Sequence, residues 1–372
     1  MIRIGAQALF AAAVVAAVLY LRRNLVTNMQ TLGIQTDFGF LDAPTRFRIL
    51  GSNFRSSQPI RDAIGVGLTN TILVSAVGIV LATILGVVVG VARLSTNWLV
   101  RRAASLYVEA LRNVPLLVVI LFWSTAVILK LPRLDVAPVY LDSVIVSNRG
   151  IWVPWFVGEP GLGMWWVILL AGIATAIGLG WWRTRRFDAT GTPHHRVAFG
   201  AAVVLVVAAA GYAVLGGPFS FSVPSKVGLG VDGGIAVGKE YGALLAGLVV
   251  YTASHIAEIV RGSIQSVERG QSEAATALGL SRFQRLRFVV LPQALRIMVP
   301  PMANQYLNLT KNSSLAVAVG YADLMFVTSV VIGNGNPAPQ SLAIVMLIYL
   351  GLSLSIAAAT NLFNRRLQVA TR

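Results

Sequence analysis

One segment of the chain has the residues and the spacing for phosphate chemistry. Gly233–Lys239, GGIAVGK, fits the phosphate-binding pattern GxxxxGK. A working loop of this kind continues with serine or threonine, whose hydroxyl reaches the magnesium ion. Here Glu240 follows and would place a negative charge beside the phosphates, and no strand-like run precedes the segment. The sequence therefore predicts no nucleotide site at this position.

The other common catalytic patterns are missing from the sequence. There is no HExxH and no nucleophile elbow, and only three histidines occur in the whole chain. Two of them, His194 and His195, stand in a basic segment that is typical of solvated surface. With no cysteine there is no disulfide framework and no thiolate metal or redox site. We therefore predict a chain that is not an enzyme, binds no metal or cofactor and has no energy source of its own.

Two pairs of opposite charge are spaced for contact on a helix. Glu109 with Arg112 and Glu258 with Arg261 are each separated by three residues. That spacing puts both members on one helical face, so two structural ion pairs are predicted. Lys311 has no acid within a helical turn. Its ammonium could snorkel to the membrane surface or hold an anionic group such as a carboxylate, and both interpretations stay open.

The composition shows what must position these residues. Of 372 residues, 56% are hydrophobic and 12% are charged, with a mean hydropathy of +0.73. Soluble domains carry about 25% charged residues, and about twenty apolar residues in a helix cross a bilayer. The sequence therefore predicts an all-α membrane protein with about eight transmembrane helices. They lie roughly at 5–21, 63–92, 106–129, 163–182, 197–215, 241–260, 293–315 and 339–363.

The net charge of +16 reflects orientation in the membrane rather than a nucleic-acid partner. Connecting segments on one side are short and hold 17 Lys or Arg, whereas the longer segments of the other side hold 12. Positive charge marks the cytoplasmic side, so both termini are predicted to be cytoplasmic. The first span, Ile4–Leu21, lacks a clear cleavage site. We interpret it as an uncleaved anchor rather than a signal peptide.

The spans differ in polarity. Those at 163–182 and 197–215 contain no ionisable residue, so they can face lipid on most sides. The spans at 63–92, 106–129, 241–260 and 293–315 carry amides, hydroxyls and charges, which suits a bundle around a polar pathway. Hydrogen bonds between helices are the alternative role for such groups. The candidate pathway or substrate residues are Asn304, Gln305, Asn308, Lys311, Asn312 and Ser313.

A polar segment, Ser272–Pro292 (SEAATALGLSRFQRLRFVVLP), interrupts the apolar sequence on the predicted cytoplasmic side. Its first part contains strong helix formers and ends at Gly279, a typical helix stop. Ser281 and Gln284 form a capping box that starts a second helix, and Pro292 marks the entry to the next span. Phe283, Leu286 and Val290 share one face of that helix. The residues alone fit either a docking surface for a partner or a helix lying on acidic lipid.

This segment resembles the EAA loop of ABC importer permeases. The pattern EAA-x3-G-x9-I-x-LP is matched except that Val289 replaces isoleucine. In that family the loop, here 262–292, is the coupling helix, which docks in a cleft of a cytoplasmic ATPase. The resemblance implies that the ATPase binds ATP and magnesium, whereas this chain binds no cofactor. The residues carried over as ATPase-coupling residues are Glu273, Ala274, Ala275, Gly279, Arg282, Leu291 and Pro292.

Neighbouring segments narrow the resemblance to polar amino-acid permeases of the histidine/glutamine type. These segments are Leu106–Trp123, Ala257–Ala275 and, most strongly, Leu291–Leu324. The run Val146–Pro154 and the extra hairpin at 163–215 resemble the general L-amino-acid permease branch. One departure is Val119, where relatives often have a glutamine near the pore, so no contact to substrate is carried over to that position.

The family implies a type I importer permease core of five helices, with an N-terminal anchor and an inserted helical hairpin. The chain then divides into an anchor and external segment (1–62), a first core part (63–130), external loops with the hairpin (131–240) and a second core part (241–372). It implies a bacterial inner-membrane location and import of L-amino acids by alternating access. Expected partners are two ATPase copies, a periplasmic amino-acid-binding protein, lipid, and a second homologous permease or a second copy of this chain.

Two other classes of transport protein remain as alternatives. An ion-coupled secondary amino-acid transporter would commonly show repeated halves and a buried acid, and a channel would need no ATPase dock. The sequence shows no convincing repeat, and its acids stand at the ends of the predicted spans. The sequence therefore favours the ATP-driven importer.

Overall fold

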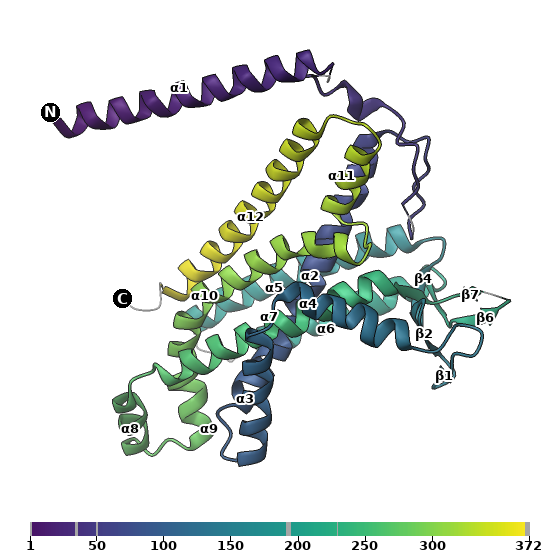
Figure 1. Cartoon of the computed structure of the whole chain (residues 1–372). Coiled ribbons are helices and arrows are strands. Elements are labelled where there is room, and N and C mark those ends of the chain that lie inside the picture. The colour runs from purple at the N-terminus through teal and green to yellow at the C-terminus, as the bar shows by residue number, and fades with distance from the viewer. Residues whose placement is uncertain (1, 34–35, 50, 191–194, 229, 369–372) are drawn as a thin grey trace. The chain divides into compact units, whose positions relative to one another are not determined.

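The computed structural model describes residues 2–33, 36–49, 51–190, 195–228 and 230–368. The chain forms two compact units (Figure 1). Unit 1 consists of Met1–Leu129 and Glu240–Arg372, and unit 2 is Lys130–Lys239.

Unit 1 begins with α1 (Ile2–Thr31), which contains the predicted first span. A 3₁₀ turn at Gly39–Asp42 follows. The chain then folds back on itself, because the amide of Thr45 donates to the carbonyl of Gln58 at 3.1 Å and the amide of Arg46 donates to that of Ser56 at 3.0 Å. This loop leads into α2 (Ile60–Ala92), whose N-cap is Pro59.

Helix α2 packs tightly against α7 (Lys239–Gln265), because glycines of α2 face it. A Cβ added at Gly86 would lie 2.6 Å from Cβ of Ile256, and one at Gly90 would lie 2.8 Å from the carbonyl oxygen of Ala257. The two glycines have the GxxxG spacing that lets membrane helices approach closely. Both helices contribute to a buried apolar cluster that also includes α10 (Leu291–Asn312).

The span predicted at 106–129 is not one continuous helix, because the chain bends sharply within it. Helix α3 (Trp98–Arg112) and helix α4 (Leu116–Phe122) are bent by 108° at the break between them. Pro115 stands at this break as the N-cap of α4. Proline disfavours helical backbone at the residue before it and cannot donate to the preceding turn. A π-helical turn at Trp123–Val127 then continues α4.

The C-terminal part of unit 1 consists of α10, a 3₁₀ turn at Ser313–Ala318, α11 (Leu324–Gly333) and α12 (Ala338–Gln368). Helices α11 and α12 share a second buried apolar cluster with the start of α2. Contact is close here as well, since a Cβ at Gly67 of α2 would lie 3.0 Å from Cα of Leu324.

Six helices of the described residues are long and apolar enough to cross a membrane, or seven if the bent pair α3–α4 counts as one span. Six of the eight predicted spans lie in these helices. The span predicted at 293–315 corresponds to α10, which is not among them. Its polar residues, such as Asn304, Asn308 and Lys311, leave no sufficiently apolar window. The chain is nevertheless a mainly helical membrane protein, as the sequence predicts.

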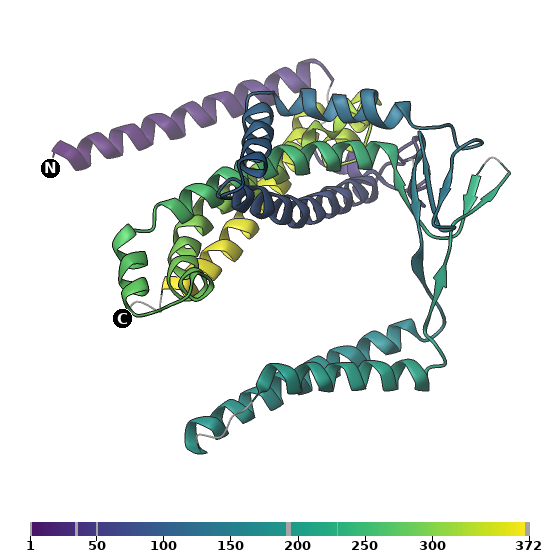
Figure 2. The ribbon, with the colours of Figure 1, turned by 90° about the horizontal axis from the view of Figure 1, so that it is seen from below.

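Unit 2 combines a helical hairpin with small antiparallel sheets, which the sequence did not predict. Helices α5 (Leu162–Thr190) and α6 (Arg196–Val214) form a hairpin, drawn in teal in Figure 2. They meet at glycine too, since a Cβ at Gly172 would lie 2.7 Å from Cγ1 of Val207. The strands form the sheet β1-β2-β3-β8 and the pairs β4-β5 and β6-β7. Their bounds are β1 Val139–Tyr140, β2 Val144–Ser147, β3 Gly150–Val153, β4 Trp155–Gly158, β5 Phe219–Ser222, β6 Ser225–Val227, β7 Gly230–Asp232 and β8 Ile235–Gly238.

Candidate functional site

The first half of the loop that resembles the EAA motif is the short helix α8 (Arg269–Ala277). It ends as predicted at Gly279, which has a φ of +76°. The amide of Gly279 donates to the carbonyl of Thr276 at 2.9 Å, and that of Leu280 donates to the carbonyl of Ala275 at 3.1 Å. These two bonds define a Schellman ending, in which the residue at positive φ is normally glycine. The loop therefore turns at a fixed angle after α8.

The second half starts with the predicted capping box. The amide of Ser281 donates to Oε1 of Gln284 at 2.9 Å, and the amide of Gln284 donates to Oγ of Ser281 at 3.3 Å. Helix α9 (Arg282–Arg285) then runs through a π-helical turn (Leu286–Val290) into α10. The π-helical turn was not predicted. It changes the spacing of side chains, so that Phe283 and Leu286 are exposed whereas Val290 is half-buried.

Side-chain hydrogen bonds join the two halves of this loop. Nη1 of Arg285 donates to Oγ1 of Thr276 at 2.9 Å, and Nε2 of Gln293 donates to Oε1 of Gln271 at 3.2 Å. Because these bonds link α8 to α9 and to α10, a force on the loop can reach the long helix that follows it. We call this connected segment, residues 269–292, the coupling loop.

The coupling loop presents both polar and apolar side chains at its surface. Glu273, Ala274 and Arg282 are exposed, whereas Ala275 is buried against the second half of the loop. Leu278 is 81% exposed and Phe283 is 67% exposed. Large apolar side chains so exposed beside charges are typical of an interaction surface. Leu291 and Pro292 lie where α10 begins, as predicted.

The predicted pathway residues do not all lie on one face of α10. Asn304, Asn308 and Lys311 are exposed, and their spacing of four and three residues places them in one row. We call this row the polar stripe. Gln305 and Asn312 are half-buried. Within a membrane, an exposed polar row needs water or a protein partner beside it.

Ser313 lies away from the polar stripe, in the protein core. Its side chain is fully buried and donates to the carbonyl of Thr310 at 2.8 Å, and the hydroxyl of Tyr349 lies 3.4 Å away. Tyr349 donates in turn to Oδ2 of Asp323 at 3.2 Å. Asp323 also caps α11, because its Oδ1 accepts from the amide of Phe326 at 2.8 Å. Ser313 thus contributes to the structure that holds α11, and its contact with a substrate stays a prediction.

Asp323 is a fully buried acid that the sequence analysis did not single out. It lies beside a second group of bonds that ties the segment before α11 to α2. Nδ2 of Asn70 donates to the carbonyl of Ala322 at 2.8 Å, and Oγ1 of Thr71 accepts from the amide of Leu324 at 3.0 Å. These polar groups of α2 are therefore bound within the protein. For them, the interpretation as hydrogen bonds between helices fits the structure.

The predicted ion pairs are found in a different arrangement. Glu258 pairs with Arg261, as expected, but also with Arg93 at the end of α2. Arg112 lies with its Nη1 3.6 Å from Oε2 of Glu258. The predicted pair between Glu109 and Arg112 is therefore wrong. Glu109 makes no ion pair in the described part of the chain, because the packing of α3 brings Arg112 to α7 instead.

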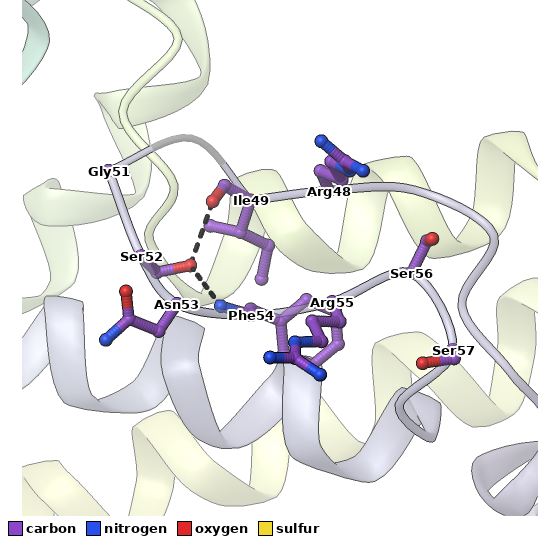
Figure 3. A pocket seen from close by; sticks show the side chains of 9 residues that line it. All are labelled: Arg48, Ile49, Gly51, Ser52, Asn53, Phe54, Arg55, Ser56 and Ser57. Carbon is purple, nitrogen blue, oxygen red and sulfur yellow. Dashed lines mark hydrogen bonds between the residues drawn. The ribbon is translucent and has the colours of Figure 1, made fainter.

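A surface hollow lies elsewhere, in the loop before α2. It has a volume of about 560 Å³, and the residues that line it include Arg48, Ile49 and 51–57. Figure 3 shows how Ser52 holds this loop, donating to the carbonyl of Ile49 at 2.8 Å and accepting from the amide of Phe54 at 3.3 Å. The hollow contains none of the predicted site residues. Its two arginines, Arg48 and Arg55, are exposed.

The phosphate-binding pattern at Gly233–Lys239 has the wrong geometry for nucleotide binding. Ile235–Gly238 form strand β8, which pairs with β3, so their backbone groups belong to a sheet. A phosphate-binding loop needs those amides free to point at the phosphates. Among the described residues, there is no group of three His, Cys, Asp or Glu side chains that could hold a metal ion.

Comparison with known proteins decides the family. The model of the family described as binding-protein-dependent transport system inner membrane component matches residues 237–369. The general L-amino acid transport system permease protein AapQ of Rhizobium johnstonii is 39% identical, over 95% of this chain and 89% of its own length. The chain belongs to this permease family.

Two further relatives match the permease over almost its full length. The putative amino-acid ABC transporter permease protein YhdX of Escherichia coli is 38% identical, over 98% of this chain and 94% of its own length. The glutamate/glutamine/aspartate/asparagine transport system permease protein BztB of Rhodobacter capsulatus is 35% identical, over 96% of this chain and 91% of its own length. The resemblance deduced from the EAA pattern is confirmed, and the permease is a transport subunit rather than an enzyme.

The segment matched by the family model includes the coupling loop and the polar stripe. It does not include α2, so sequence reasoning based on the motif missed the part that α2 plays. Arg93 is one of the 17 Lys or Arg that the charge distribution assigns to the short connecting segments, and that distribution does not predict its pairing with Glu258. The glycine spacing GVVVG was the available signal, because GxxxG in an apolar helix predicts a close helix contact.

Proposed function

We propose that this permease is the membrane subunit of an ATP-driven importer of L-amino acids, working by alternating access. The coupling loop is the observation that carries the proposal. It joins the EAA pattern, an exposed surface and a rigid connection to α10 in one segment of 24 residues, 269–292. A loop of this kind can transmit the closure of a separate ATPase to the helix that carries the polar stripe.

Amino acids are the substrate class that fits both the relatives and the polar stripe. The related permeases are named for L-amino acids and for glutamate, glutamine, aspartate and asparagine. Lys311 supplies an exposed positive charge that suits an α-carboxylate, and Asn304 and Asn308 supply amide donors and acceptors on the same face. Gln305 and Asn312 flank this row. Which amino acids the permease carries depends on groups beyond this stripe.

The permease needs other subunits for this function. The family works with an ATPase and a binding protein. We place two ATPase copies, with their ATP and magnesium, against the coupling loop in the cytoplasm, where both termini also lie. A periplasmic amino-acid-binding protein would deliver substrate to the other side of the inner membrane. Because the polar stripe is exposed, a homologous permease or a second copy of this chain is expected to complete the pathway.

The test uses two substitutions at the turn of the coupling loop. Gly279 has a φ of +76°, which proline cannot adopt, whereas asparagine tolerates this conformation. Gly279→Pro should abolish ATP-dependent amino-acid uptake in membrane vesicles while the protein is still inserted. Gly279→Asn should keep most of the uptake. Glu273→Lys, a charge reversal on the exposed face of α8, should also uncouple ATP hydrolysis from transport.

Purification in mild detergent supplies the second readout. The wild-type permease should bring an ATPase and a second permease with it, and Gly279→Pro should lose the ATPase. Normal uptake in both Gly279→Pro and Glu273→Lys would contradict the coupling role. Uptake by the purified chain alone, without ATP, would instead support an ion-coupled transporter.

A further inference from the structure

Three arginine side chains surround the carboxylate of Glu258. Arg93 and Arg261 form ion pairs with it, and Nη1 of Arg112 lies 3.6 Å from its Oε2. Arg93 is the C-cap of α2, Arg112 is the last residue of α3, and Glu258 and Arg261 belong to α7. The ends of two helices therefore converge with their cations on one acid of a third helix. We call these four residues the arginine cluster.

The arginine cluster carries an excess of positive charge. Three guanidinium groups face one carboxylate, which leaves two positive charges. The C-terminal ends of α2 and α3 each contribute about −0.5 of an elementary charge, so an excess of roughly one positive charge remains. Glu109, one turn before Arg112, makes no ion pair in the described residues and does not supply the missing negative charge.

Two donors of the arginine cluster lack an acceptor. Nε of Arg93 and Nε of Arg261 are buried and form no hydrogen bond within the described protein. The side chain of Arg93 is only 11% exposed. A buried charged donor without an acceptor is costly, so the arrangement favours a further acceptor with several oxygens.

The close packing of α2 and α7 keeps this charge in place. Gly90 lies one turn before Arg93 and allows α2 to approach Ala257 and Val260 of α7. Without that approach, Arg93 could turn toward solvent. The helix contact therefore holds positive charge inside the protein, although repulsion between the guanidinium groups opposes it.

The surroundings of the cluster indicate which anion reaches it. Arg112 is 43% exposed, so the cluster opens to the surface beside α3. The distribution of charge in the sequence places this end of α2 at the cytoplasmic interface. Phospholipid phosphates lie at this depth.

We infer that the arginine cluster is an oxyanion site between α2, α3 and α7 that takes a singly charged phosphate group. Guanidinium groups match phosphate oxygens because they donate in a planar fork, and three of them from three helices suit a tetrahedral anion. The phosphate comes either from an anionic phospholipid or from free inorganic phosphate. Bound there, it would join the ends of α2 and α3 to α7, the helix that leads into the coupling loop.

The test measures lipid binding to the intact transporter complex, purified in mild detergent. Phosphatidylglycerol, which carries one negative charge, is titrated against phosphatidylcholine, and bound lipid is counted by native mass spectrometry. Arg112→Gln should weaken phosphatidylglycerol binding about tenfold, because a charged contact is lost. The matched control is Arg102→Gln, which removes an exposed arginine from the same helix and should change nothing.

A third variant should change phosphatidylglycerol binding in the opposite direction from Arg112→Gln. Glu258→Gln removes the negative charge of the cluster and should strengthen phosphatidylglycerol binding. A simple network of internal ion pairs would instead be weakened by this change without binding more anion. If Glu258→Gln does not fold, the comparison of Arg112→Gln with Arg102→Gln decides the matter alone.

A second arm separates the two sources of phosphate. Delipidated complex is melted with inorganic phosphate or with phosphatidylglycerol, and the melting temperature is compared with that of Arg112→Gln. Stabilisation by phosphatidylglycerol alone identifies a lipid site, and equal stabilisation by inorganic phosphate identifies a free-anion site. The inference is overturned if neither stabilises the wild type, or if Arg112→Gln and Arg102→Gln bind phosphatidylglycerol equally.

Discussion

The α2–α7 contact and the α5–α6 hairpin are both close helix contacts made at glycine, but they hold different kinds of side chain together. In each, a glycine lets two helices approach so closely that a Cβ would lie 2.6–2.8 Å from the facing helix. Between α2 and α7, that approach brings Arg93 to Glu258, near the end of α7 that precedes the coupling loop. In the hairpin, the facing residues are apolar, and its arginines lie at one end, where Arg183 covers Phe199 at 3.8 Å.

The difference teaches that close helix packing alone does not indicate function. What matters is which charges the packing holds together. The hairpin exposes much of its apolar surface, including Val167 and Leu170, and suits lipid. At the α2–α7 contact, by contrast, Glu258 is held between arginines that come from α2, α3 and α7. The predictions below test this contrast, from the largest expected effect to the smallest.

The largest effect is expected from Gly90→Ala. Its new Cβ would lie 2.8 Å from the carbonyl oxygen of Ala257, a backbone atom that cannot move aside. Overpacking of this kind costs about 1–3 kcal/mol, and most of the uptake should be lost as Arg93 is displaced. Gly262→Ala on α7 is the matched control, because its Cβ meets nothing within 4 Å. That control should gain up to about 1 kcal/mol from helix propensity.

Melting temperatures of the two purified variants, measured together with uptake, check this prediction. Equal melting temperatures and equal uptake in Gly90→Ala and Gly262→Ala would contradict the contrast between the two regions.

An intermediate effect is expected from Lys311→Gln in the polar stripe. If the ammonium binds the α-carboxylate of the substrate, its loss removes a charged hydrogen bond worth about 1.5–3 kcal/mol. The KM for uptake should then rise about tenfold or more. Lys311→Arg keeps the charge and should stay much closer to the wild type.

Uptake measured over a range of amino-acid concentrations separates KM from the maximal rate. An unchanged KM in Lys311→Gln would mean that Lys311 snorkels to the membrane surface instead.

The smallest effect is expected from Gly172→Ala in the hairpin. Its Cβ would lie 2.7 Å from Cγ1 and 3.0 Å from Cβ of Val207, side-chain atoms that yield more easily than the backbone carbonyl met at Gly90, so a loss near 1 kcal/mol is expected. Gly178→Ala, whose Cβ meets nothing within 4 Å, is the control. Uptake should be normal in both, and the melting temperature should fall only in Gly172→Ala. Loss of uptake in Gly172→Ala alone would give the hairpin a part in the pathway.

The sequence was most reliable where structure depends on neighbouring residues. The end of α8 at Gly279 and the capping box of Ser281 and Gln284 follow from contacts within one helical turn, and both are confirmed. Six spans follow from long apolar runs and are confirmed as helices of sufficient length. The break at Pro115 was missed although Arg112 and Asn113 interrupt the apolar run just before it and the proline itself was a signal.

The sequence by itself thus determined the membrane class, the helix end and capping box within residues 269–292, and the family, because composition, caps and motif spacing are properties of the chain. Only the tertiary structure decided that Arg112 pairs with Glu258 rather than Glu109, and that Ser313 is buried while Lys311 is exposed. An ion pair between helices depends on which faces meet and how closely. Here the glycines of α2 and the bend after α3 set those distances, and neither effect can be seen from the spacing of the charges alone.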